Sequence, residues 1–261
     1  MIPYPTVQGV WPQFRSPLTW DFWAILTHLT AIALLWYVGL IPDLATLRDR
    51  AKTRRRQLLY GLAALGWRGS ARHWALHQRA HRMVALMLIP LLFVMQAIVS
   101  FEFVGTLVPD WHETRQPLHF IATGIQLGIA MVLLVALALR HRLGLHRHID
   151  AWDIDLLAKL LLANAIVTAY AYAGGWFMEL MAEERVREAL LARMTGPYWL
   201  LYWGGFILSV LPPQIFWWRR ARAHWLTGTA VATLVLVGIY LDYLSVVVGG
   251  LVRTNLMRAA P

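Results

Sequence analysis

Residues 118–140 read LHFIATGIQLGIAMVLLVALALR, and their only Lys, Arg, Asp or Glu is the last residue. A helix needs about 20 apolar residues to cross the roughly 30 Å hydrocarbon layer of a bilayer, so this run predicts a membrane-spanning helix. Five other segments meet the same criterion. The six predicted spans are about 19–41, 84–106, 118–140, 155–177, 197–217 and 225–250. The sequence therefore predicts an all-α, polytopic integral membrane helix bundle.

The composition supports a membrane class and excludes several others. Of the 261 residues, 59% are hydrophobic and 14 are Trp, which is too apolar for an ordinary soluble domain. The net charge of +10 is carried by basic residues clustered between the spans, so we expect no nucleic-acid partner. The chain has no cysteine, which excludes disulfides and thiolate-bound iron–sulfur clusters in it.

The distribution of Lys and Arg predicts the orientation in the membrane. The connections 42–83, 140–154 and 218–224 hold sixteen of them, and the other connections and the two tails hold seven. Because cytoplasmic loops carry the excess of Lys and Arg, these three connections are predicted to be cytoplasmic and both termini to be outside. The predicted domains are an outer N-terminal tail (1–18), a membrane domain (19–250) and an outer C-terminal tail (251–261).

Three further local features follow from residue type. The stretch 44–83 is too polar to cross the bilayer and predicts one or two amphipathic interfacial helices on the cytoplasmic side. Pro90 and the pair Pro212-Pro213 are expected to kink or break their helices. The last span is long and is expected to tilt or to break near Gly249-Gly250.

Two acids in apolar spans are the main indication of function. Asp21 lies at the start of the first span and Glu102 near the end of the second, so the orientation puts both near the outer surface. A charge in hydrocarbon is costly, and an acid kept there usually faces a bundle interior and carries protons or binds a polar ligand. The aromatic residues Trp20, Trp23, Phe101 and Phe103 flank them. The alternative is that each acid simply reaches headgroup water from a helix end.

Other polar residues leave alternatives open. His28 lies seven residues after Asp21 on nearly the same helix face, either as part of the site or as a packed histidine bonded to a neighbouring helix. Asp242 is a further acid in the last span, with no partner identifiable from sequence. A b-type haem would need two histidines on facing helices, and within the spans the sequence offers only His28 and His119. No metal site is expected.

Four strings in the first half of the chain point to one family. They are FRSPL at 14–18 with Trp20-Asp21, WYVGLIPDLA at 36–45, GWRGSA at 66–71, and IVSFEF at 98–103 followed by PDWH at 109–112. They resemble the NrfD/polysulphide reductase membrane subunits, most closely the quinol-binding NrfD-like subunit of bacterial alternative complex III. Gln96 departs from the family, which often has a histidine there, and so does His28, where a tyrosine is expected.

The resemblance implies a function and a site. Asp21 matches the acid of a WDF motif in the family and Glu102 the acid of an SFDF motif, so these two are the predicted catalytic residues. The predicted quinol-binding residues are Trp20, Trp23, His28, Phe101, Phe103 and His112. The resemblance implies oxidation of menaquinol or ubiquinol near the periplasmic face of a bacterial inner membrane. Electrons would pass to a periplasmic iron–sulfur subunit, with a multihaem cytochrome and other membrane subunits in the complex.

The extent of the resemblance qualifies this prediction. The six spans correspond to the fourth to ninth helices of the family, so the chain is expected to be a fragment whose quinol pocket is incomplete when it stands alone. No haem or iron–sulfur cluster is expected in this chain. The alternatives are a membrane anchor or assembly subunit without its own quinone site, and a haem-b cytochrome.

Overall fold

The computed structural model describes the backbone of residues 17–104 and 116–259, and the side chains of residues 19–101, 117–184 and 186–248. Every regular element in these ranges is a helix. Six of the helices are long and apolar enough to cross a membrane. The predicted class, a polytopic helical membrane bundle, is confirmed.

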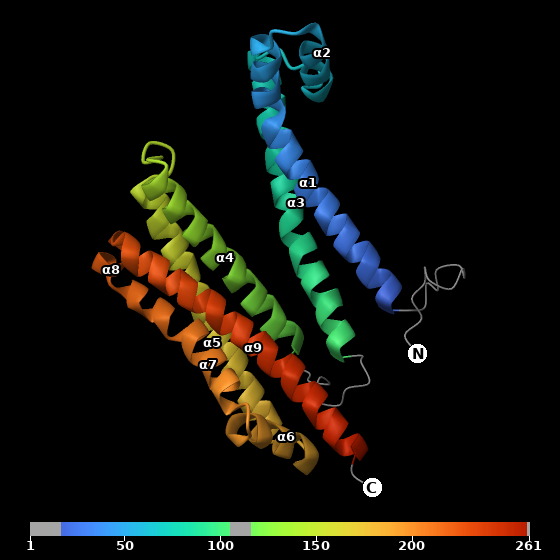
Figure 1. The fold of residues 1–261 in the computed structure, drawn as a ribbon, viewed down its shortest axis with the longest axis vertical. Coiled ribbons are helices and arrows are strands. Elements are labelled where there is room, and N and C mark those ends of the chain that lie inside the picture. Colours follow the sequence, from blue (N-terminus) through green and yellow to red (C-terminus); the bar gives the residue numbers. More distant parts are fainter. Residues whose placement is uncertain (1–16, 105–115, 260–261) are drawn as a thin grey trace. The chain divides into compact units, whose positions relative to one another are not determined.

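The chain divides into two compact units, residues 1–102 and 103–261. The N-terminal unit is built from α1 (Pro17–Arg50), α2 (Arg54–Ala63) and α3 (Ala71–Val104), coloured blue to green in Figure 1. At 1.5 Å per residue, the 34 residues of α1 and of α3 each extend about 51 Å, well beyond the roughly 30 Å hydrocarbon layer. Both helices therefore continue into the polar stretch 44–83, which holds one short separate helix, α2.

Hydrogen bonds tie the connection between α1 and α3 to α1. The Tyr37 hydroxyl donates to the carbonyl oxygen of Ala63 at 2.8 Å, and Arg48 Nη1 donates to that of Trp67 at 2.8 Å. The Ser70 hydroxyl accepts a hydrogen bond from the backbone N–H of His73, as an N-terminal capping serine does. The connection is thus a folded hairpin, and α2 exposes its leucines, which suits a helix lying at the membrane surface.

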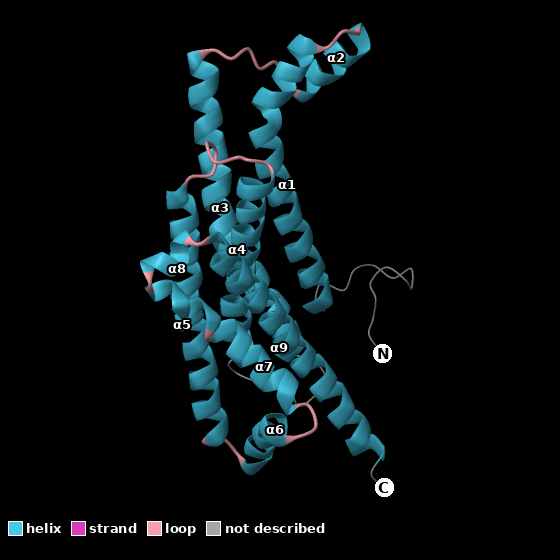
Figure 2. Ribbon diagram, turned by 60° about the vertical axis from the view of Figure 1, so that its left-hand side comes forward, coloured by secondary structure: helices cyan, strands magenta, loops and turns pink. Residues whose placement is uncertain are grey.

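The C-terminal unit is a bundle of four long helical segments. Its elements are α4 (Gln116–Arg142), α5 (Ala151–Leu180), α6 (Glu184–Thr195), α7 (Trp199–Val210), the 3₁₀ helix η2 (Pro212–Trp217), α8 (Arg219–Ala223) and α9 (Trp225–Ala259). Helix α9 packs along α7 and α4, and α4 packs along α5 (Figures 1 and 2). The core between them is apolar, and its fully buried side chains include Leu133, Leu161, Phe216, Val235 and Ile239.

The proline and glycine predictions have different outcomes. The predicted break at Pro212-Pro213 is present, because α7 ends at Val210 and the chain continues as η2. Proline lacks the N–H that an α-helix needs, which explains the change. At Pro90, α3 continues without interruption. Helix α9 also runs unbroken through Gly249-Gly250, so the alternative of a break there is wrong.

Candidate functional site

Two of the predicted site residues lie on one face of α1 and carry enclosed polar atoms. Asp21 Oδ1 and His28 Nδ1 are both shielded from solvent, and neither has a hydrogen-bond partner among the residues that the structure describes. His28 is 9% exposed, whereas Asp21 is partly buried. A separation of seven positions is about two helical turns, so the two side chains share a face about 10 Å apart along the axis.

Ser100 on α3 is a third residue with an enclosed polar side-chain atom. It is fully buried, and within the described part of the chain its hydroxyl oxygen also has no hydrogen-bond partner. A buried polar group left unpaired costs about 1–3 kcal/mol, so each such group calls for an explanation. One explanation for Asp21 and His28, which share a face of α1, is a ligand with hydroxyl groups that completes their hydrogen bonds.

The other predicted residues are less enclosed or fall outside the description. Trp20, Trp23 and Phe101 are exposed, at 57%, 48% and 61%. The side chains of Glu102 and Phe103, and His112 as a whole, lie outside the described residues.

The structure brings together a second polar cluster, in the C-terminal unit. His119 Nε2 of α4 lies 2.8 Å from Asp242 Oδ2 of α9, and the Tyr172 hydroxyl of α5 donates to Asp242 Oδ1 at 2.6 Å. All three side chains are buried, and the rings of His119 and Tyr172 meet edge to face at 4.6 Å. Asp242 thus has a partner on each carboxylate oxygen, from two different helices.

A second polar layer lies deeper on the same face of α4. Thr123 follows His119 by four residues and is 3.1 Å from the Tyr243 hydroxyl. Gln126 follows three residues later, donates to the backbone oxygen of Ser209 at 2.6 Å and accepts from the Thr168 hydroxyl at 2.5 Å. These side chains link α4 to α5, α7 and α9. Together the two layers fix how the four segments of the bundle are rotated against one another.

His119, Asp242 and Tyr172 form a hydrogen-bonded cluster that is shielded from solvent. If His119 Nε2 carries the hydrogen shared with Asp242, Nδ1 is left as an acceptor. Nδ1 is buried and has no hydrogen-bond partner among the described residues. Sequence reasoning named Asp242 and His119 but did not pair them. The sequence indicates only that the three residues have a similar depth, because Asp242, His119 and Tyr172 all lie toward the outer ends of their predicted spans.

The described residues hold no group of three or more His, Cys, Asp and Glu side chains arranged to bind a metal ion. Of the histidines considered for haem, His119 already uses Nε2 in its contact with Asp242. His73, His77 and His81 lie along α3, and the His73 and His77 rings pack against Trp67. These contacts account for both histidines as packed side chains.

The six apolar helices, four of them joined by polar side chains buried in the C-terminal unit, define a multi-pass integral membrane protein. The sequence matches the polysulphide reductase NrfD family over residues 8–255. The chain belongs to this family, whose members are membrane subunits of quinol-linked redox enzymes and typically pair with iron–sulfur subunits. No curated protein matched the sequence.

Proposed function

We propose that this chain binds quinol in its N-terminal unit, at the outer ends of α1 and α3. The observation that carries the proposal is the set of enclosed polar atoms that have no hydrogen-bond partner among the described residues, Asp21 Oδ1, His28 Nδ1 and Ser100 Oγ. A quinol has a hydroxyl at each end of a flat ring, so it suits a site with polar groups at two depths and aromatic side chains nearby. Membership of a quinol-linked family supports the same ligand.

The proposed chemistry uses carboxylates as proton acceptors. Oxidation of a quinol to a quinone releases two electrons and two protons, and Asp21 and Glu102 each accept one of the protons. Carboxylates near the outer surface then pass the protons to water on that side. His28 and His112 hydrogen-bond the quinol, while Trp20, Trp23, Phe101 and Phe103 hold its ring.

The electrons must leave through another subunit. With no cysteine, this chain cannot supply thiolate ligands for an iron–sulfur cluster, so we propose a periplasmic iron–sulfur partner as the acceptor. A multihaem cytochrome would complete the complex. The strings in the first half of the chain favour the alternative complex III branch of the family, in a bacterial inner membrane, with menaquinol or ubiquinol as substrate.

One observation favours a second candidate function, a membrane anchor or assembly subunit. Trp20, Trp23 and Phe101 are exposed in the structure and do not by themselves enclose a ring. In an anchor, these side chains would contact lipid or a neighbouring subunit, and no quinol would bind. The two candidates differ in one measurable quantity, the affinity of the complex for a quinol analogue.

The proposal is tested by replacing Asp21 with asparagine in the assembled complex. Loss of one charge-assisted hydrogen bond is expected to weaken binding of a fluorescent quinol-analogue inhibitor about tenfold, measured by quenching of its emission. The matched control is Asp43→Asn, an exposed acid further along α1, which is expected to leave the dissociation constant unchanged. Equal dissociation constants for the two variants would exclude Asp21 from the site and support the anchor.

A further inference from the structure

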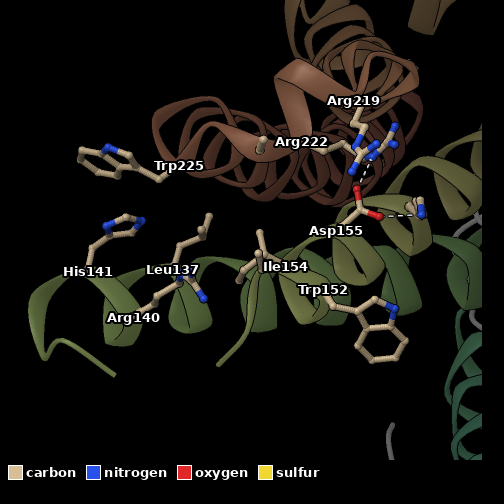
Figure 3. A pocket seen from close by; sticks show the side chains of 12 residues that line it. Leu137, Arg140, His141, Trp152, Ile154, Asp155, Arg219, Arg222 and Trp225 are labelled. Carbon is tan, nitrogen blue, oxygen red and sulfur yellow. Dashed lines mark hydrogen bonds and ion pairs between the residues drawn. The ribbon is translucent and has the colours of Figure 1, made fainter. Parts of the chain in front are cut away.

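A cavity of about 570 Å³ opens at the end of the C-terminal unit opposite the His119–Asp242–Tyr172 cluster. It is formed where α4 ends, α5 begins and α8 leads into α9, and Figure 3 shows the side chains that line it. Its lining comes from two of the connections that hold the excess of Lys and Arg, 140–154 and 218–224, and from the adjoining helix ends. By that distribution, the cavity lies at the cytoplasmic surface of the membrane.

The lining of the cavity is cationic. Arg140, Lys159, Arg219 and Arg222 line it together with a single acid, Asp155. Asp155 already forms ion pairs with two of these cations, because Arg222 Nε lies 2.6 Å and Lys159 Nζ 2.5 Å from its carboxylate oxygens (Figure 3). The remaining positive charge is therefore not balanced by acids of the lining.

Arg219 is the cation with the most hydrogen-bonding capacity to spare. It makes no hydrogen bond or ion pair with any residue that the structure describes, whereas Arg140 donates to the backbone oxygen of Ile149. Arg219 and Arg222 are three residues apart on α8, so their side chains emerge as neighbours on one face. Asp155 pairs with Arg222 and Lys159, so no acid of the lining is left to pair with Arg219.

Apolar and aromatic side chains complete the cavity. Leu137 and Ile154 line it from α4 and α5, and Trp152 and Trp225 line it with exposed rings, at 69% and 45%. Tryptophan is the residue that most favours the headgroup region of a bilayer. The cavity therefore combines cations, an apolar wall and aromatic rings at headgroup depth, which matches the parts of a phospholipid.

We propose that this cavity binds the phosphate headgroup of an anionic phospholipid from the cytoplasmic leaflet, with Arg219 as its principal contact. Basic pockets between membrane helices on the cytoplasmic side bind such headgroups, and the negative charge of that leaflet concentrates them there. Arginine suits the role because its planar fork of donors matches two phosphate oxygens. The lipid would hold the ends of α4, α5 and α8 together.

The experiment measures lipid retention by native mass spectrometry of the full chain in neutral detergent, titrated with phosphatidylglycerol. Arg219→Gln is expected to weaken the tightest binding of phosphatidylglycerol about five- to tenfold, since one cation near a headgroup contributes about 1 kcal/mol or more. The matched control is Arg220→Gln, which removes the same charge from the same helix at a residue that does not line the cavity. We expect it to bind phosphatidylglycerol as the unaltered protein does.

Two further measurements distinguish an anionic phospholipid from other ligands that carry a phosphate group. Phosphatidylcholine in place of phosphatidylglycerol is expected to bind weakly and without dependence on Arg219. Inorganic phosphate at millimolar concentration is expected neither to bind in an Arg219-dependent way nor to displace the lipid. Equal weakening by the two Gln variants, equal retention of the two lipids, or Arg219-dependent capture of inorganic phosphate would each overturn the proposal.

Discussion

Replacing Asp242 with alanine is expected to lower the free energy of unfolding of the C-terminal unit by about 3–5 kcal/mol. The carboxylate is 3% exposed and has a partner on each oxygen, His119 at 2.8 Å and Tyr172 at 2.6 Å. Alanine removes both contacts and leaves a buried imidazole and a buried hydroxyl without this acceptor. The measurement is unfolding of the purified chain in detergent micelles, followed by circular dichroism.

The Asp242 result has a graded comparison and a control. Asp242→Asn keeps an acceptor for Tyr172 and is expected to cost less, because a neutral hydrogen bond between membrane helices is worth about 0.6–1.7 kcal/mol. Glu188→Ala removes an exposed acid of α6 and is expected to leave the free energy of unfolding unchanged. If Asp242→Ala unfolded with the same free energy as the unaltered protein, the His119–Asp242–Tyr172 cluster would not stabilise the bundle.

Replacing Gly238 with alanine is expected to cost about 1–3 kcal/mol by overpacking the contact between α7 and α9. A Cβ at Gly238 would lie 2.6 Å from the backbone nitrogen of Ser209, and one at Gly205 would lie 2.9 Å from Asp242 Cα. Because both neighbours are backbone atoms, the helices themselves must separate. Small residues at such crossings let membrane helices approach closely.

Gly128→Ala is the matched control for the Gly238 substitution. Gly128 lies within α4, is exposed, and its added Cβ would meet nothing within 4 Å. Alanine is the better helix former, so this change is expected to be neutral or to stabilise by up to about 1 kcal/mol. If thermal unfolding in micelles shifted equally for the two variants, close packing at Gly238 would not be the reason.

The number of membrane-spanning helices could be predicted from sequence because the bilayer imposes a length and a composition on each span. The break at Pro212-Pro213 was equally predictable, since proline removes a backbone donor. The lengths of α1 and α3 were not predictable by the same rule. Hydropathy marks where a span leaves the hydrocarbon, whereas a helix such as α1 continues through polar residues to Arg50.

The contacts between spans could not be predicted. His119 and Asp242 are separated by 123 residues, and their contact depends on which helices pack together and on how each is rotated. The sequence predicts only how deep in the membrane each residue lies, and several polar residues lie at the same depth. The same argument that grouped Asp21 with Glu102 would have grouped His119, Tyr172 and Asp242. The structure shows that the residues of the second group, His119, Tyr172 and Asp242, are in contact.

The central claim is that quinol binds in the N-terminal unit, at the outer ends of α1 and α3. The most direct test is photolabelling of the assembled complex with an azido-quinone, followed by identification of the labelled residues by mass spectrometry. The proposal predicts labels within residues 17–28 and 98–103, reduced by an excess of unlabelled quinone. Labels confined to residues 116–259, or to other subunits of the complex, would contradict it.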